Sequence, residues 1–164
     1  MTKCNRYKKN MIVAICFLFS CNSKNKEISI NETGFFINEL EHKVKNNGNK
    51  IAYKLLATEY LDNNRESDLL PFSIYMVNEF NNYEFCYDVF LGYYLKQNLI
   101  NDNKYSLDKL NNNDLDSAIF YLKKGADLKD FQCMKRLGEY YLEGKYVIKN
   151  LEEGKRLISS AKLK

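Results

Sequence analysis

Three stretches of the chain share one spacing of apolar and small residues, which predicts three helices of the same design. They are residues 51–60, 87–95 and 132–141, and in each the four matched positions follow one another at steps of four, one and three. Because an α-helix turns once in about 3.6 residues, these steps place all four side chains on one face. The matched sets are Ala52/Leu56/Ala57/Tyr60, Tyr87/Leu91/Gly92/Leu95 and Cys133/Leu137/Gly138/Tyr141.

Each of these stretches is followed by a second run with helical periodicity. The runs are LLPFSIYMVNEF, LDSAIFYLKKGA and LEEGKRLISSA, and Asp68, Asp114 and Asn150 precede them at positions typical of an N-cap. Upstream, residues 34–46 have the pattern of one further helix. We therefore expect a leading helix and then three helix pairs within residues 34–164.

Two glycines near the end of the chain are predicted to have different roles. Gly138 lies inside a helical pattern, where glycine costs roughly 1 kcal/mol relative to alanine. We expect Gly138, Gly92 and Ala57 to mark the crossing of each first helix with its partner, where a large side chain would overpack. Gly144 follows the last apolar turn and is expected to end its helix in the left-handed conformation.

The repeated pattern resembles the Sel-one-like repeats, which are relatives of the tetratricopeptide repeats. The resemblance covers about residues 34–164, and it implies an all-α fold, a short α-solenoid of stacked antiparallel helix hairpins. The middle unit departs from the family by Leu95 and by the added residues DNKYSLDKLN, and the first unit departs by Pro71 and Phe72. The last unit matches in unbroken register at Cys133, Leu137, Gly138, Tyr141, Gly144, Val147, Asn150, Leu157 and Ala161.

The resemblance also implies where a partner would bind. In tetratricopeptide arrays the first helices line a concave face, and the outward positions lie two and six residues after the small residue. In this chain those positions, with one more a turn further on, are Lys54, Thr58, Val89, Tyr93, Lys96, Lys135 and Glu139. Tyr93 is the expected anchor because tyrosine offers a large amphipathic contact area at small entropic cost.

The N-terminus has the pattern of a targeting signal, predicted to be residues 1–20. A basic start precedes the apolar run 11–19, which is shorter than the roughly 20 residues that span a bilayer. Leu18-Phe19-Ser20-Cys21 resembles a bacterial lipobox, which implies lipid on Cys21 and a flexible tether over residues 21–33. The alternative is an ordinary secretory signal with a chance cysteine. We expect the bacterial cell envelope, and Asn22 favours the outer membrane; the chain would face the periplasm or the cell surface.

Charge argues against a nucleic-acid partner. The chain has 25 basic and 21 acidic residues, and four of the basic ones lie in residues 1–20. The remaining chain therefore has 21 of each and no net charge. It has no excess of positive charge for binding phosphates.

No catalytic or metal-binding pattern is present, so we expect neither an enzyme nor a cofactor. His42 is the only histidine, and residues 101–116 lack the glycine and the glutamate of an EF-hand loop. Cys86 and Cys133 lack zinc-ligand spacing and are expected to be small buried residues. A disulfide between them would need a sideways offset of the two helices.

The pattern as a whole predicts a membrane-anchored module that binds a protein or peptide partner on its concave helical face. The alternative is an immunity-type lipoprotein that neutralises a toxic effector. Self-association of the terminal repeats is a further option, because the end units of such arrays expose apolar faces unless they are capped.

Overall fold

The computed structural model describes residues 30–96 and 106–162, and within these residues it contains helices and no strands. The prediction of an all-α fold is therefore confirmed. The α-helices are α1 (Ile30–Asn47), α2 (Lys50–Asp62), α3 (Leu70–Asn78), α4 (Cys86–Lys96), α5 (Asn112–Asp127), α6 (Phe131–Glu143) and α7 (Leu151–Ala161), and two short 3-10 helices, η1 (Glu66–Leu69) and η2 (Tyr83–Phe85), precede α3 and α4. None of the described helices combines the length and the apolar character that a membrane span requires.

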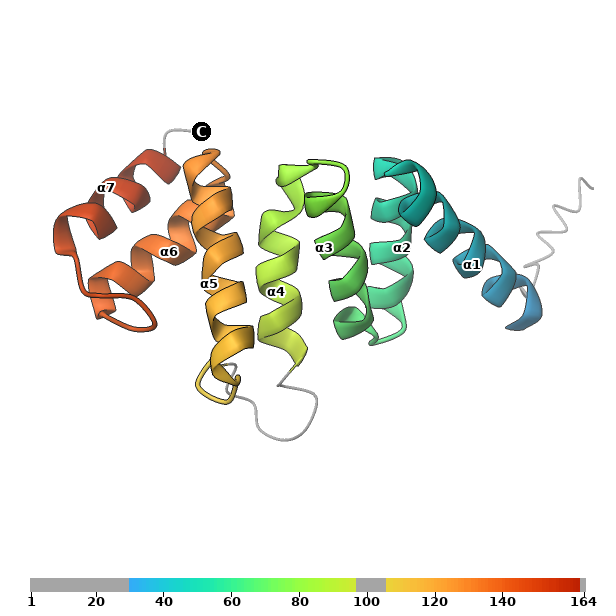
Figure 1. The fold of residues 1–164 in the computed structure, drawn as a ribbon, viewed down its shortest axis with the longest axis horizontal. Helices are drawn as coiled ribbons and strands as arrows, with labels where there is room; N and C mark the ends of the chain where they lie inside the picture. Colours follow the sequence, from blue (N-terminus) through green and yellow to red (C-terminus); the bar gives the residue numbers. More distant parts are fainter. Residues whose placement is uncertain (1–29, 97–105, 163–164) are drawn as a thin grey trace, which may run out of the picture.

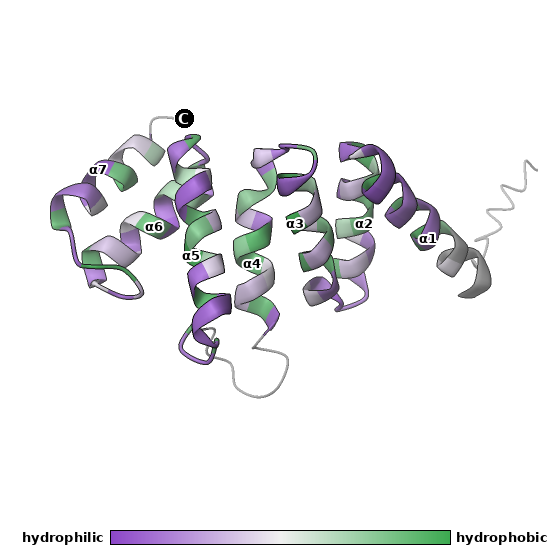
Figure 2. Cartoon of the chain, viewed as in Figure 1, coloured by the Kyte–Doolittle hydropathy of each residue, from purple (hydrophilic) through white to green (hydrophobic). Residues whose placement is uncertain are grey.

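The seven described helices follow one another in chain order along the long axis of the molecule, with α1 and α7 at opposite ends (Figure 1). Each packs mainly against helices one or two positions away in the sequence. Figure 2 shows that α1 is largely hydrophilic, whereas the central helices α3 and α4 are more hydrophobic. This difference is expected because a central helix is covered on more sides than a terminal one.

The predicted helices are found, with one shift at the N-terminal end. Residues 51–60, 87–95 and 132–141 lie in α2, α4 and α6, and the three second runs lie in α3, α5 and α7. The leading helix α1 begins at Ile30 rather than at residue 34, so residues 30–33 of the predicted tether are helical. The predicted signal, Cys21 and the rest of the tether lie outside the described residues.

Four helices begin with a side-chain cap, in which an oxygen of the N-cap residue accepts a hydrogen bond from the amide three residues on. The prediction of Asn150 as such a cap is confirmed. The predictions of Asp68 and Asp114 are wrong, because η1 intervenes before α3, and α5 starts earlier, so that Asp114 lies in its first turn. The N-cap residues are Asn49, Asn111, Asp130 and Asn150.

Gly138 and Gly154 allow α6 and α7 to approach closely. A Cβ atom on Gly138 would lie 2.8 Å from Cγ1 of Ile158 and 3.0 Å from the carbonyl oxygen of Gly154. The prediction that Gly138 marks the crossing of a helix with its partner is therefore confirmed. Gly144 ends α6 with φ +71°, and its N–H donates to the Tyr140 carbonyl at 2.9 Å, as expected for a left-handed cap.

Gly92 does not have the predicted contact. Its nearest neighbour is Leu70 at the start of α3, where an added Cβ atom would lie 2.9 Å from the Leu70 Cβ atom. The three atoms nearest to such a Cβ all belong to Leu70, so Gly92 packs against α3 rather than marking a crossing with α5. The orientation of α4 therefore differs from that of α6.

Residues 106–110 tie the α4–α5 connection to the loop between α6 and α7. Leu107 and Leu110 are buried, and the Leu107 N–H donates to the Tyr146 hydroxyl at 3.0 Å. Lys145 lies 3.5 Å from Asp108, which adds an ion pair between the same two segments. Part of the insertion that distinguishes the middle unit is thus packed into the structure.

Gly125 of α5 lies between the two cysteines of the described chain. A Cβ atom on Gly125 would come within 2.3 Å of the Cys133 sulfur and within 3.0 Å of the Cβ atom of Cys86. Both thiols are free and fully buried. Burial raises the pKa of Cys86 to about 11 and that of Cys133 further, so both thiols are neutral at physiological pH.

Gly125→Ala should therefore destabilise the protein. We expect a loss of about 1–3 kcal/mol in the free energy of unfolding, the usual cost of overpacking a filled site. Urea denaturation followed by circular dichroism measures it. Gly34→Ala in α1 is the matched control, because among the described residues no atom beyond its chain neighbours and its own helix backbone lies within 4 Å of the added methyl group, and it should stabilise by about 0.5–1 kcal/mol. Equal effects of the two substitutions would contradict the close approach at Gly125.

Candidate partner-binding surface

The first helices α2, α4 and α6 each leave one side uncovered by other described helices. On α2 the predicted residues Lys54 and Thr58 are exposed, and on α6 Lys135 is exposed and Glu139 is half-buried. Thr58 donates its hydroxyl hydrogen to the Lys54 carbonyl at 3.1 Å, a bond within the helix. These four residues lie on open sides of their helices, as expected.

The three predicted residues on α4 lie elsewhere. Val89 is 0% exposed, so it is not accessible to a partner, and this prediction is wrong. Tyr93 packs against the core beside Tyr121 of α5, and Lys96 forms an ion pair with Asp114 of α5 at 3.0 Å. Tyr93 and Lys96 are thus turned toward α5 rather than toward the open side.

The open side of α4 carries Tyr87, Leu91 and Leu95 instead. All three are half-buried, and each lines a hollow shared with a neighbouring first helix. Relative to the prediction, the helix is rotated by two residues, or about 200°. The physical reason is that α4 is apolar on nearly every side, so several orientations would bury apolar side chains. The orientation found in the structure buries Val89 and Phe90.

We define the first-helix surface as the open sides of α2, α4 and α6 together with η1. Two hollows of this surface lie on either side of α4. The α2–α4 groove has a volume of about 260 Å³ and is lined by Ala57, Leu61, Glu66, Leu69, Asp88, Leu91, Gly92 and Leu95. Its lining is apolar except for two carboxylates.

One of these carboxylates, Asp88, is part of a hydrogen-bond network among α2, α3 and α4. The Tyr53 hydroxyl donates to Oδ2 of Asp88 at 2.9 Å, and Oγ of the fully buried Ser73 lies 2.7 Å from the same hydroxyl. Burial raises the pKa of Asp88, although the Tyr53 hydrogen bond and the nearby Lys54 oppose the change. The pKa of Tyr53 is also raised, by its burial and by the charge of Asp88.

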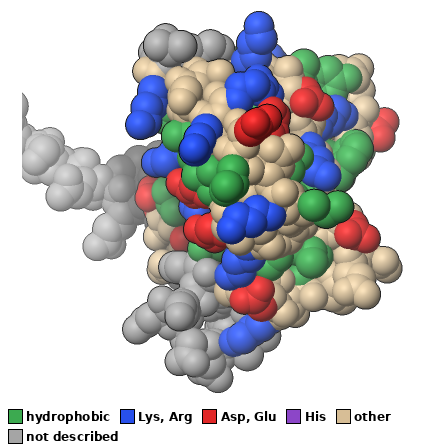
Figure 3. Space-filling model, turned by 90° about the vertical axis from the view of Figure 1, so that its left-hand side faces the viewer, with side chains coloured by type: hydrophobic (Ala, Val, Ile, Leu, Met, Phe, Trp, Pro, Cys, Tyr) green, Lys and Arg blue, Asp and Glu red, His purple; other side chains and the backbone are tan. Residues whose placement is uncertain are grey.

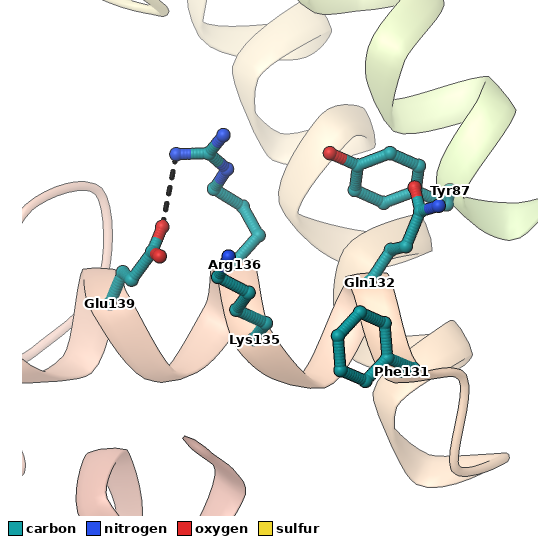
Figure 4. Close-up of a pocket in the computed structure, with 6 residues that line it drawn as sticks. All are labelled: Tyr87, Phe131, Gln132, Lys135, Arg136 and Glu139. Carbon is teal, nitrogen blue, oxygen red and sulfur yellow. Dashed lines mark hydrogen bonds and ion pairs between the residues drawn. The ribbon is translucent and has the colours of Figure 1, made fainter. Parts of the chain in front are cut away.

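The second hollow, the α4–α6 pocket, is polar and aromatic. Its volume is about 220 Å³, and in Figure 4 Tyr87 enters it from α4 while the other lining residues come from α6. Arg136 donates to Glu139 at 3.0 Å. Burial alone would lower the pKa of Arg136, but the charge of Glu139 raises it above its usual value. The residues from α6 are Phe131, Gln132, Lys135, Arg136 and Glu139.

The α7 end of the molecule has a mixed surface. Figure 3 shows apolar side chains scattered among basic and acidic ones on this end. Ile148 is 92% exposed and Leu151 is also exposed, whereas Glu152, Lys155 and Arg156 make the exposed side of α7 charged. The exposed surface of α7 and of the loop before it therefore combines charged and apolar side chains.

The described residues contain no group of three or more histidines, cysteines or acidic residues that could hold a metal ion. His42 lies exposed on α1. Comparison of the chain with protein-family models, with curated proteins and with solved structures gave no match.

Sequence reasoning missed several residues of this surface. The periodic pattern places Leu91 and Leu95 on the same helix face as Gly92, the predicted crossing, and it gives Asp88 and Arg136 no role. One available signal was Asp88 itself, because an acidic residue within the apolar run CYDVFLGYYL indicates the side of the helix that meets solvent. Leu91 and Leu95 follow Asp88 and Tyr87 on that side at helical spacing.

Asp88→Asn should stabilise the protein at neutral pH. Because the pKa of Asp88 is raised in the folded state, the wild type binds its proton more tightly when folded and loses stability as pH rises from about 4, the usual carboxyl pKa. Asparagine is uncharged and still offers an oxygen to Tyr53. Thermal unfolding at pH 4 and pH 7 should therefore show an advantage of the variant that grows with pH.

The control is Glu152→Gln, which removes one exposed carboxylate from α7 and so changes the net charge by the same amount. A loss of stability in Asp88→Asn that is as large at pH 7 as at pH 4 would show that the Asp88 charge is not a cost to the fold.

Proposed function

We propose that this chain is a membrane-anchored interaction module that binds a protein or peptide partner on the first-helix surface. In this proposal the helices form a short α-solenoid of antiparallel hairpins, of the Sel-one-like and tetratricopeptide type. The proposal is supported by the chain-order arrangement of the helices and by the packing of each helix against its near neighbours in sequence. In such an arrangement the open sides of α2, α4 and α6 follow one another along the molecule and are accessible to a partner.

The observation that carries the proposal is the pairing of an apolar groove with a polar pocket on either side of α4. The α2–α4 groove offers leucine side chains, and the α4–α6 pocket offers Tyr87, Lys135 and the Arg136–Glu139 pair. A peptide needs both kinds of contact, because apolar contacts contribute affinity and charged and polar groups fix register. Arg and Tyr are also among the residues that most often dominate binding energy at interfaces.

The anchor in this proposal is a lipid on Cys21, with the helical part held at the bacterial cell envelope and preferably at the outer membrane. Its support is the order of basic start, short apolar run and cysteine within residues 1–21. No enzymatic step and no cofactor are included in the proposal.

Cys21→Ser should release the chain from the membrane. Lipid on the cysteine supplies the anchor, so we expect loss of radiolabelled palmitate and transfer of the protein to the soluble fraction. Cys16→Ser, a change of the same kind within the apolar run, is the control and should keep both. Palmitate labelling that survives in Cys21→Ser would place the modification elsewhere or exclude it.

Photocrosslinking tests the binding surface. With p-benzoylphenylalanine in place of Leu91, we expect a defined crosslinked product in intact cells. The same probe in place of Phe120, which is 56% exposed on α5, should give none. Lys135→Glu should weaken the Leu91 product by reversing a charge at the neighbouring pocket. Equal products from both positions, insensitive to Lys135→Glu, would exclude this surface.

A further inference from the structure

The α2–α4 groove has an acidic character that its volume and apolar lining do not reveal. The two charged side chains that line it are both carboxylates, Glu66 from η1 and Asp88 from α4. Within the described part of the chain, Glu66 forms no ion pair. From the described residues Asp88 accepts one hydrogen bond, that of Tyr53, and a carboxylate can accept about four.

The positive charges around the groove only partly offset these carboxylates. Lys54 lies near Asp88 and lowers the pKa of its carboxyl, but burial raises this pKa by more. Arg65, which immediately precedes η1, forms an ion pair with Asp68 at 2.8 Å. The groove therefore combines an apolar lining with two carboxylates that can accept further hydrogen bonds.

We propose that the α2–α4 groove binds a partner segment that is both apolar and basic. Aliphatic side chains of the segment would lie against Leu61, Leu91 and Leu95, and a lysine or arginine would reach Asp88 and Glu66. This inference rests on the proposed function and names the partner chemistry for one half of the surface. Burial of Asp88 strengthens such a contact, because charge-assisted hydrogen bonds gain strength away from water.

The neighbouring pocket has the opposite balance of charge. The α4–α6 pocket contains Lys135 and Arg136 against the single carboxylate of Glu139. A segment that crosses both hollows is therefore expected to be basic only where it meets the α2–α4 groove. This polarity distinguishes the inferred partner from a uniformly polybasic peptide.

Fluorescence anisotropy with designed peptides tests the inference. The probe is a labelled 12-residue peptide of leucine, lysine and serine, and its companions replace either the lysines by glutamate or the leucines by serine. The full chain is held in phosphatidylcholine nanodiscs, and nanodiscs without protein give the blank. We expect the leucine-lysine peptide to bind best of the three.

The double variant Glu66→Gln with Asp88→Asn should weaken that binding about tenfold, as expected for loss of a charge-assisted hydrogen bond. The control is Asp127→Asn with Glu152→Gln, which removes two exposed carboxylates outside the groove and should bind as the wild type does. Leu61→Ser tests the apolar contact at a residue that is 59% exposed, so that folding is not at stake. It too should weaken binding.

Three results would overturn the inference: equal affinity of the two double variants, preference for the glutamate peptide, or no binding above the blank. A dimer of the wild type that disappears in Glu66→Gln with Asp88→Asn would assign the groove to a second copy and would overturn it as well. The proposed function is judged separately by the Leu91 crosslink. If that crosslink persists while the peptides fail, only the partner chemistry is wrong.

Discussion

The structure depends on how closely neighbouring helices approach one another. Because each described helix packs mainly against its near neighbours in sequence, each contact must be well packed by itself. Among the described residues, glycine supplies the space at several of these contacts: Gly138 with Gly154 between α6 and α7, Gly92 against Leu70 between α4 and α3, and Gly125 against Cys86 and Cys133. The helix propensity lost at a glycine is offset by the dispersion contacts that the closer approach allows.

Polar contacts add specificity to this packing. Tyr53, Ser73 and Asp88 join three helices through hydroxyl and carboxylate groups, and Tyr53 is nearly fully buried. An apolar core would tolerate small rotations of α4, whereas a hydrogen bond of 2.9 Å between Tyr53 and Asp88 fixes its orientation relative to α2. The orientation that results turns Leu91 and Leu95 outward, so the network that orders the fold also sets the lining of the groove.

The parts of the fold that the sequence predicted well are those in which one helix face is apolar and the other is polar. In α6 and α7 the small and apolar positions are separated from charged ones, and Gly138, Gly144 and Asn150 lie where the pattern placed them. In α4 nearly all positions are apolar. Leu91-Gly92 therefore matches Leu137-Gly138 in the sequence pattern, although the two pairs lie on different sides of their helices. The pattern could not distinguish the two orientations, because contacts with Leu70 and Tyr53 decide between them and both residues are distant in sequence. The predicted residues on α2 and α6 are therefore accessible, whereas Val89 on α4 is buried.

The tie between Tyr146 and Leu107 has a mechanical consequence. It joins the connection after α4 to the loop after α6, and so it braces the second and third helix pairs at a point beyond their helical packing. Relative bending of α4 and α5 against α6 and α7 would break this bond. The α4–α6 pocket therefore lies between helices that this loop-to-loop bond holds together in addition to their own packing.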